Sequence, residues 1–68
     1  MSLQEEAKQI LTEIFGPNTG LKADKFAQEF PPEKKGKEFL DKCSGLVKSF
    51  ISESVADEKF SGLYAQVK

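Results

Sequence analysis

The 68-residue sequence contains no histidine, no arginine and only one cysteine, Cys43. Without histidine, the usual general base near neutral pH is missing, and a catalytic serine or cysteine would have no imidazole partner. A single cysteine excludes an intramolecular disulfide, and without a histidine to join it a zinc site is not expected. We therefore expect a protein that is not an enzyme and that binds no metal and no cofactor.

Lysine carries all ten positive charges, and eleven acids oppose them, so the net charge is −1. An acidic balance is not the electrostatic footprint of a general nucleic-acid binder. The absence of arginine also removes the side chain that most often recognises guanine and phosphate with two parallel hydrogen bonds. Nucleic acid is therefore not the expected partner, and an anionic ligand would need a local patch of lysines.

Long apolar runs are absent too. No stretch approaches the roughly 18 residues that suggest a membrane span, and the N-terminus lacks the basic region and apolar core of a secretion signal. We expect no membrane partner and a cytoplasmic location. A chain this short buries only about 60% of the surface that its unfolded form exposes. With disulfides and metals excluded, its stability must come from packing or from a second chain.

Apolar residues recur at the spacing of one helical face in four segments. The predicted helices cover residues 3–15, 21–30, 32–53 and 57–66. The sequence shows neither the alternation typical of strands nor an internal repeat. The expected fold class is therefore all-α, a compact bundle of about four short helices in a single domain over residues 1–68.

The predicted ends of these helices are marked by residues that stop or start a helix. A glycine–proline pair ends the first helix at Phe15, because the glycine suits a left-handed cap and the proline cannot continue the helix. The proline pair at 31–32 separates the second helix from the third. Ser54 with Asp57 has the form of a capping signal, which predicts the start of the fourth helix.

The predicted third helix has the longest apolar stripe and is expected to organise the core. The stripe consists of Phe39, Leu40, Cys43, Leu46, Val47, Phe50 and Ile51. We interpret Cys43 as a small buried hydrophobe with little thiolate. Ser44 and Lys48 have the spacing of a Ser–Lys dyad, but on a charged helix we expect an ordinary surface pair. Gly45 is expected to let another helix approach closely.

A run of lysines follows the proline pair. It consists of Lys34, Lys35 and Lys37. One hypothesis is that these residues bind an anion or a nucleic acid. The alternative is a solvated helix surface, because Glu38 lies four residues from a lysine on either side and such pairs are worth only a few tenths of a kcal/mol. A later helix start at the weak helix former Gly36 would instead place the lysines in a linker.

Six phenylalanines are a large apolar supply for so short a chain. We expect some of this surface to contact a partner protein or a second copy of the chain, as in a homodimer. The candidates for an exposed apolar patch are Phe26, Phe30, Phe60, Leu63 and Val67. The alternative is that each is an ordinary core residue. The predicted function is a small non-enzymatic helical interaction module or assembly subunit, with anion or nucleic-acid binding through the lysine run as the alternative.

Overall fold

The computed structural model describes residues 2–67, which form four helices. They are α1 (Leu3–Phe15), α2 (Pro17–Glu29), α3 (Pro32–Phe50) and α4 (Glu53–Tyr64). No strand occurs in this part of the chain. The structure thus confirms the all-α bundle predicted from the spacing of apolar residues.

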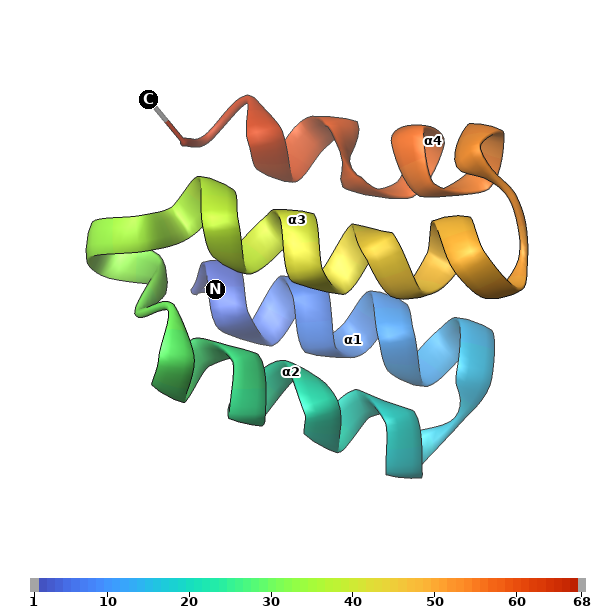
Figure 1. Ribbon diagram of the computed structural model, residues 1–68, viewed down its shortest axis with the longest axis horizontal. Helices are drawn as coiled ribbons and strands as arrows, with labels where there is room; N and C mark the ends of the chain where they lie inside the picture. The colour runs from blue at the N-terminus through green and yellow to red at the C-terminus, as the bar shows by residue number, and fades with distance from the viewer. Residues whose placement is uncertain (1, 68) are drawn as a thin grey trace.

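The helices lie in the order α2, α1, α3, α4 across the view in Figure 1. The two inner helices, α1 and α3, contact each other and both outer helices, whereas α2 and α4 make no contact within residues 2–67. The α1–α2 and α3–α4 connections lie at one end of the bundle, and both chain termini lie at the other (Figure 1). Phe15 and Phe50, the last residues of α1 and α3, are therefore brought to the same end.

The junction of α1 and α2 is a single residue. Gly16 has a φ of +107°, which favours glycine, and its N–H donates to the carbonyl oxygen of Thr12 at 2.8 Å. The predicted end of α1 at Phe15 is confirmed, but α2 begins four residues earlier than predicted. The reason is Pro17, which suits the first position of a helix because its missing N–H has no intrahelical partner there.

Helices α1 and α2 pack closely because Gly20 faces Thr12. A Cβ atom at position 20 would overlap the Oγ1 atom of Thr12. Beside this contact, Lys8 Nζ lies 2.9 Å from Asp24 Oδ2, and the Gln4 side-chain amide donates to Asp24 Oδ1 at 2.8 Å. These two hydrogen bonds lower the pKa of Asp24 below its ordinary value. One glycine and one polar cluster thus fix α2 against α1.

The core takes residues from all four helices. It contains Ala7, Leu11, Ala23, Ala27, Phe39, Leu40, Cys43, Val47, Ala56, Phe60 and Leu63. The chain exposes 4487 Å², and a folded monomer of 7.6 kDa exposes about 4,300 Å² by the usual scaling with mass. One chain therefore closes its own core, and burial alone does not require a second one.

Helix α3 has a kink at Lys35, where φ is −127° and ψ is 48°. The N–H groups of Lys34 and Lys35 both donate to the carbonyl oxygen of Pro31, at 2.9 and 2.6 Å, and close a separate turn. The regular helix starts at Gly36. The helix nevertheless begins at Pro32, as predicted, so the lysine run lies within α3 and not in a linker.

The two glycines of α3 have different surroundings. Gly36 is buried because Leu3 and Val67 approach it, so that a Cβ there would lie 3.2–3.3 Å from their methyl groups. Gly45 was the glycine expected to admit a neighbouring helix, yet no atom lies within 4 Å of a Cβ at that position. The prediction for Gly45 is wrong because α4 crosses α3 on the side of Asp41 and Ser44, through Tyr64.

A break between α3 and α4 is confirmed, but it falls at Ile51 and Ser52 rather than between Ser54 and Asp57. Ser52 is extended, and its hydroxyl accepts from the backbone N–H of Val55 at 3.2 Å, which is the geometry of a helix N-cap. The sequence contains several serines here, and spacing alone selected the wrong one. Because α4 starts at Glu53, its residues 56, 60 and 63 face the core.

Candidate protein-contact surface

Large apolar side chains are exposed at three positions among residues 2–67. Phe50 is 70% exposed, Leu21 is 59% exposed and Ile51 is 51% exposed. Phe50 and Ile51 were predicted as the last members of the α3 core stripe. They stand where α3 ends: Phe50 is its last residue, and Ile51 is the C-cap and lies outside the helix. The end of α3 at Phe50, three residues earlier than predicted, is the feature that sequence reasoning missed.

A shallow crevice of about 190 Å³ adjoins Phe50. Its lining residues are Phe15, Thr19, Lys22, Leu46 and Phe50. The rings of Phe15 and Phe50 meet edge to face, with centroids 6.0 Å apart and an interplanar angle of 79°. The crevice thus has two aromatic walls, one lysine and no acid among its lining residues.

Two rows of side chains follow α2 and α3 from the crevice. Lys22, Phe26 and Phe30 recur every four residues on α2 and its C-cap. Lys42, Leu46 and Phe50 recur in the same way on α3. Residues four apart lie on one side of a helix, so each set forms a row. We call these six residues the α2–α3 face.

The two rows run in opposite directions because α2 and α3 are antiparallel (Figure 1). At one end, Lys22 and Phe50 line the same crevice. At the other end, the Lys42 ammonium lies 5.8 Å from the centre of the Phe30 ring. Phe26 and Phe30 are half-buried against the core. The α2–α3 face is therefore apolar in the middle and has a lysine opposite an aromatic ring at each end.

Of the apolar patch proposed from the sequence, only part is available for contact. Phe26 and Phe30 belong to the α2–α3 face, half-buried. Phe60 and Leu63 lie in the core, 0% and 5% exposed, because α4 starts earlier than predicted and turns them inward. Val67 packs against Gly36 and is half-buried. Phe60, Leu63 and Val67 therefore do not form an exposed patch with the two phenylalanines of α2.

Charge is unevenly distributed over the bundle. Within residues 2–67, Lys8 is the one lysine that has a carboxylate oxygen within 4.0 Å. The ion pairs expected between Glu38 and the lysines four residues away are not formed, and Lys42 lies over Phe30 instead. The lysines of the α2–α3 face are thus not neutralised. On the other side of the molecule, acids outnumber lysines on both α1 and α4.

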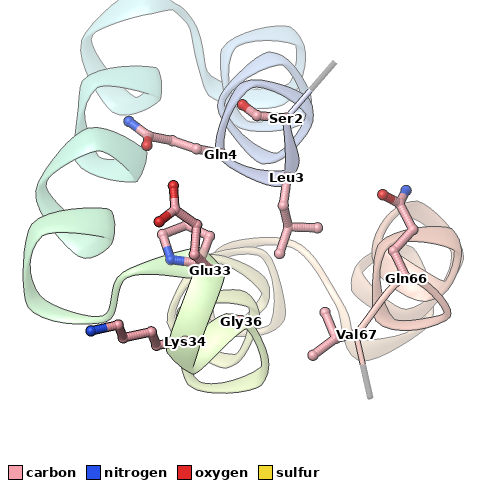
Figure 2. A pocket seen from close by; sticks show the side chains of 9 residues that line it. Ser2, Leu3, Gln4, Glu33, Lys34, Gly36, Gln66 and Val67 are labelled. Carbon is pink, nitrogen blue, oxygen red and sulfur yellow. The ribbon is translucent and has the colours of Figure 1, made fainter.

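The lysine run lies beside a larger surface cavity of about 590 Å³. The cavity is lined by Ser2, Leu3, Gln4, Pro32, Glu33, Lys34, Gly36, Gln66 and Val67. Figure 2 shows the Glu33 carboxylate on the side of Gln4, while the Lys34 ammonium extends away from Leu3 and Val67. Lys35 and Lys37 are exposed and do not line this cavity. The three lysines do not converge on one site, and a carboxylate at the rim opposes an anion.

Cys43 and Ser44, two nucleophilic side chains, are both buried in α3. Burial raises the pKa of the Cys43 thiol to about 12, so the thiolate that nucleophilic chemistry needs is scarce. Ser44 is also buried, contrary to the expected surface pair, and its hydroxyl lies 3.2 Å from that of Tyr64. Tyr64 in turn donates to Asp41 Oδ1 at 2.5 Å. These groups join α3 to α4.

No three Cys, Asp or Glu side chains within residues 2–67 are grouped as metal ligands would be. Over the same residues, no helix combines the length and the apolarity needed to cross a membrane. Comparison with known proteins finds no matching family model, no matching curated protein and no matching solved structure. The geometry of the α2–α3 face is therefore the feature from which function is inferred.

Proposed function

We propose that this protein is a small, non-enzymatic protein-binding module that acts through the α2–α3 face. The distribution of its phenylalanines carries the proposal. Two of the six, Phe39 and Phe60, are fully buried. The other four, Phe15, Phe26, Phe30 and Phe50, all lie on this face or line its crevice. Aromatic side chains concentrated on one surface are typical of protein interfaces.

The energetics support the same interpretation. Covering an exposed phenylalanine is worth on the order of 2 kcal/mol, and Phe50 still exposes 70% of its surface. The 4487 Å² that the chain exposes is close to the value for a monomer, so this ring is not needed to complete the core. The Phe50 ring already contacts the Phe15 ring edge to face, so less conformational entropy is lost when a partner immobilises the Phe50 side chain. The cytoplasmic location expected from the sequence remains part of this proposal.

Affinity capture from the native source tests the proposal. The chain is compared with a Phe50→Ser/Ile51→Ser variant, which removes the exposed apolar end of α3. Leu21→Ser is the matched control, because the exposure of Leu21, 59%, lies between those of Phe50 and Ile51 and the residue is not one of the six of the α2–α3 face. We expect a specific partner to bind the parent chain and the Leu21→Ser variant, and to be lost from the double variant.

Two results would contradict the proposal. One is that no specific protein is recovered with the parent chain. The other is that the same protein is recovered equally with the Phe50→Ser/Ile51→Ser variant. We expect circular dichroism to show that each variant retains the fold, because all three positions are exposed and their replacement by serine leaves the core intact.

A further inference from the structure

We infer that the partner presents an acidic amphipathic helix, which lies along the α2–α3 face with its apolar side chains on the phenylalanines and its carboxylates at Lys22 and Lys42. This inference rests on the proposed function and names the chemistry of the partner. It follows from the spacing of the two rows, from the charge at their ends and from what a second copy of the chain can offer.

The length of the face fits a helix. From its first to its last residue each row covers eight steps along the chain, which is about 12 Å or a little over two turns at the rise of an α-helix. An amphipathic helix that binds in a groove uses apolar anchors at i, i+3 or i+4, and i+7, over the same distance. Phe26, Phe30 and Leu46 are half-buried against the core between the two lysines, and Phe50 lines the crevice at one end.

The positive charge of the α2–α3 face favours a partner with negative charge. Lys22 and Lys42 stand at opposite ends of the two rows, and neither has a carboxylate oxygen within 4.0 Å. Two acids of these helices are already engaged, because Asp24 pairs with Lys8 toward α1 and Asp41 accepts from Tyr64 toward α4. A partner with carboxylates beside its apolar anchors would be steered to this face and complement both lysines.

The remaining acids of α2 and α3 lie toward the end of the face that holds Phe30 and Lys42. They are Glu29, Glu33 and Glu38. The crevice end, with Lys22 and Phe50, has no acid among its lining residues. The partner's carboxylates are therefore favoured most strongly at the crevice end, and Lys22 is the lysine whose reversal should weaken binding most.

A second copy of this chain does not supply such a helix. Its acid-rich helices, α1 and α4, expose no large apolar side chain within residues 2–67, where the exposed ones are Leu21, Phe50 and Ile51. A symmetric contact between two α2–α3 faces would offer no carboxylate to Lys22 or Lys42, because the six residues of the face include no acid. The lysines would then be desolvated without a partner of opposite charge. The complementary ligand is therefore a different chain.

The probe is a fluorescein-labelled 18-residue helical peptide with leucine at the anchor positions and glutamate at most others, measured by fluorescence anisotropy. A peptide with lysine in place of each glutamate is the matched ligand. The protein variants are Lys22→Glu/Lys42→Glu and, as a control with the same change in net charge, Lys34→Glu/Lys37→Glu. We expect the glutamate peptide to bind the parent chain and the control, with affinity reduced about tenfold or more in Lys22→Glu/Lys42→Glu and in high salt.

The possible failures are distinguishable. If both peptides bind the parent chain equally and Phe50→Ser/Ile51→Ser abolishes binding, the acidic partner is refuted while the apolar contact surface stands. If the Lys34→Glu/Lys37→Glu variant loses binding instead, the lysine run is the site and the inference is overturned. The inference is also overturned if a labelled single-stranded DNA binds more tightly than the glutamate peptide does, or if the glutamate peptide does not bind at low salt. The capture experiment decides the proposed function separately.

Discussion

Replacing Gly20 with alanine tests the close packing of α1 on α2, on which the shape of the α2–α3 face depends. At an open position inside a helix, alanine is about 1 kcal/mol more favourable than glycine. At position 20 the added methyl group meets the side chain of Thr12 and lies 3.5 Å from the carbonyl oxygen of Lys8. Such overpacking costs roughly 1 to 3 kcal/mol. We therefore expect Gly20→Ala to lower the free energy of unfolding by up to about 2 kcal/mol after the helix gain is included.

The measurement is thermal and urea unfolding followed by circular dichroism. For a chain of this size, each kcal/mol moves the midpoint temperature by about 4 to 8 °C. Gly45→Ala is the control, because nothing lies within 4 Å of its added methyl group, and it should raise the midpoint. Thr12→Ala removes the Oγ1 atom that the added methyl group meets. In the Gly20→Ala background it should therefore restore most of the lost free energy of unfolding. If Gly20→Ala stabilises the chain as much as Gly45→Ala does, α1 and α2 are not packed as described.

Further predictions concern the core and its titratable groups. Phe60→Ala should cost about 3 to 5 kcal/mol, enough to unfold a chain of this size, and a folded variant in circular dichroism would refute the burial of Phe60. Native Cys43 should react with a thiol reagent at pH 8 at least roughly 1000-fold more slowly than in urea, and equal rates would contradict its burial. The pKa of Tyr64 is raised by burial and by its hydrogen bond to Asp41. The contribution of Tyr64 to stability is therefore intact below the ordinary tyrosine pKa of about 10, and it is lost as the pH rises through the pKa of Tyr64 in the folded chain. Alkaline titration of absorbance at 295 nm reports Tyr64 alone, because it is the single tyrosine, and a midpoint at the ordinary value would refute the hydrogen bond. The pKa of Asp24 is lowered by Lys8 and Gln4, so its stabilisation is present above its ordinary pKa of 3.8 and is lost as the pH falls below that value. An Asp24→Asn variant should lack this dependence in acid unfolding.

Local chemistry predicted the helices well where one residue type decides the outcome. Gly16 takes a positive φ that other residues avoid, and α1 ends before it as expected. The proline pair separates α2 from α3 because Pro31 cannot continue one helix and Pro32 can begin the next. The apolar spacing of α3 placed Phe39, Leu40, Cys43 and Val47 in the core.

Features that depend on neighbouring helices were not predictable in this way. Pro17 can either follow a turn or begin a helix, and the packing of Gly20 on Thr12 stabilises the second choice. Phe50 and Phe60 look alike in sequence, yet one is 70% exposed and the other fully buried. Phe50 is the last residue of α3, whereas Phe60 lies in the middle of α4 among the residues that pack into the core.

The candidate site was predictable only in part for the same reason. Phe26 and Phe30 were identified from the sequence as contact residues, whereas Lys22, Lys42, Leu46 and Phe50 were not. Their rows are 20 residues apart in the chain and become neighbours only when α2 and α3 pack antiparallel (Figure 1). The three residues of the lysine run are close in sequence, but of the three only Lys34 lines the cavity beside them.

Backbone amide NMR during titration with the glutamate peptide gives the most direct view of how a partner would bind. We expect the largest shift changes on the α2–α3 face and at the crevice, in the amides of Lys22, Phe26, Leu46 and Phe50, with little change in α1 before residue 12 and in α4. Changes that centre on the cavity beside Lys34, or on α1 and α4, would contradict binding at the α2–α3 face, as would an unchanged spectrum at low salt.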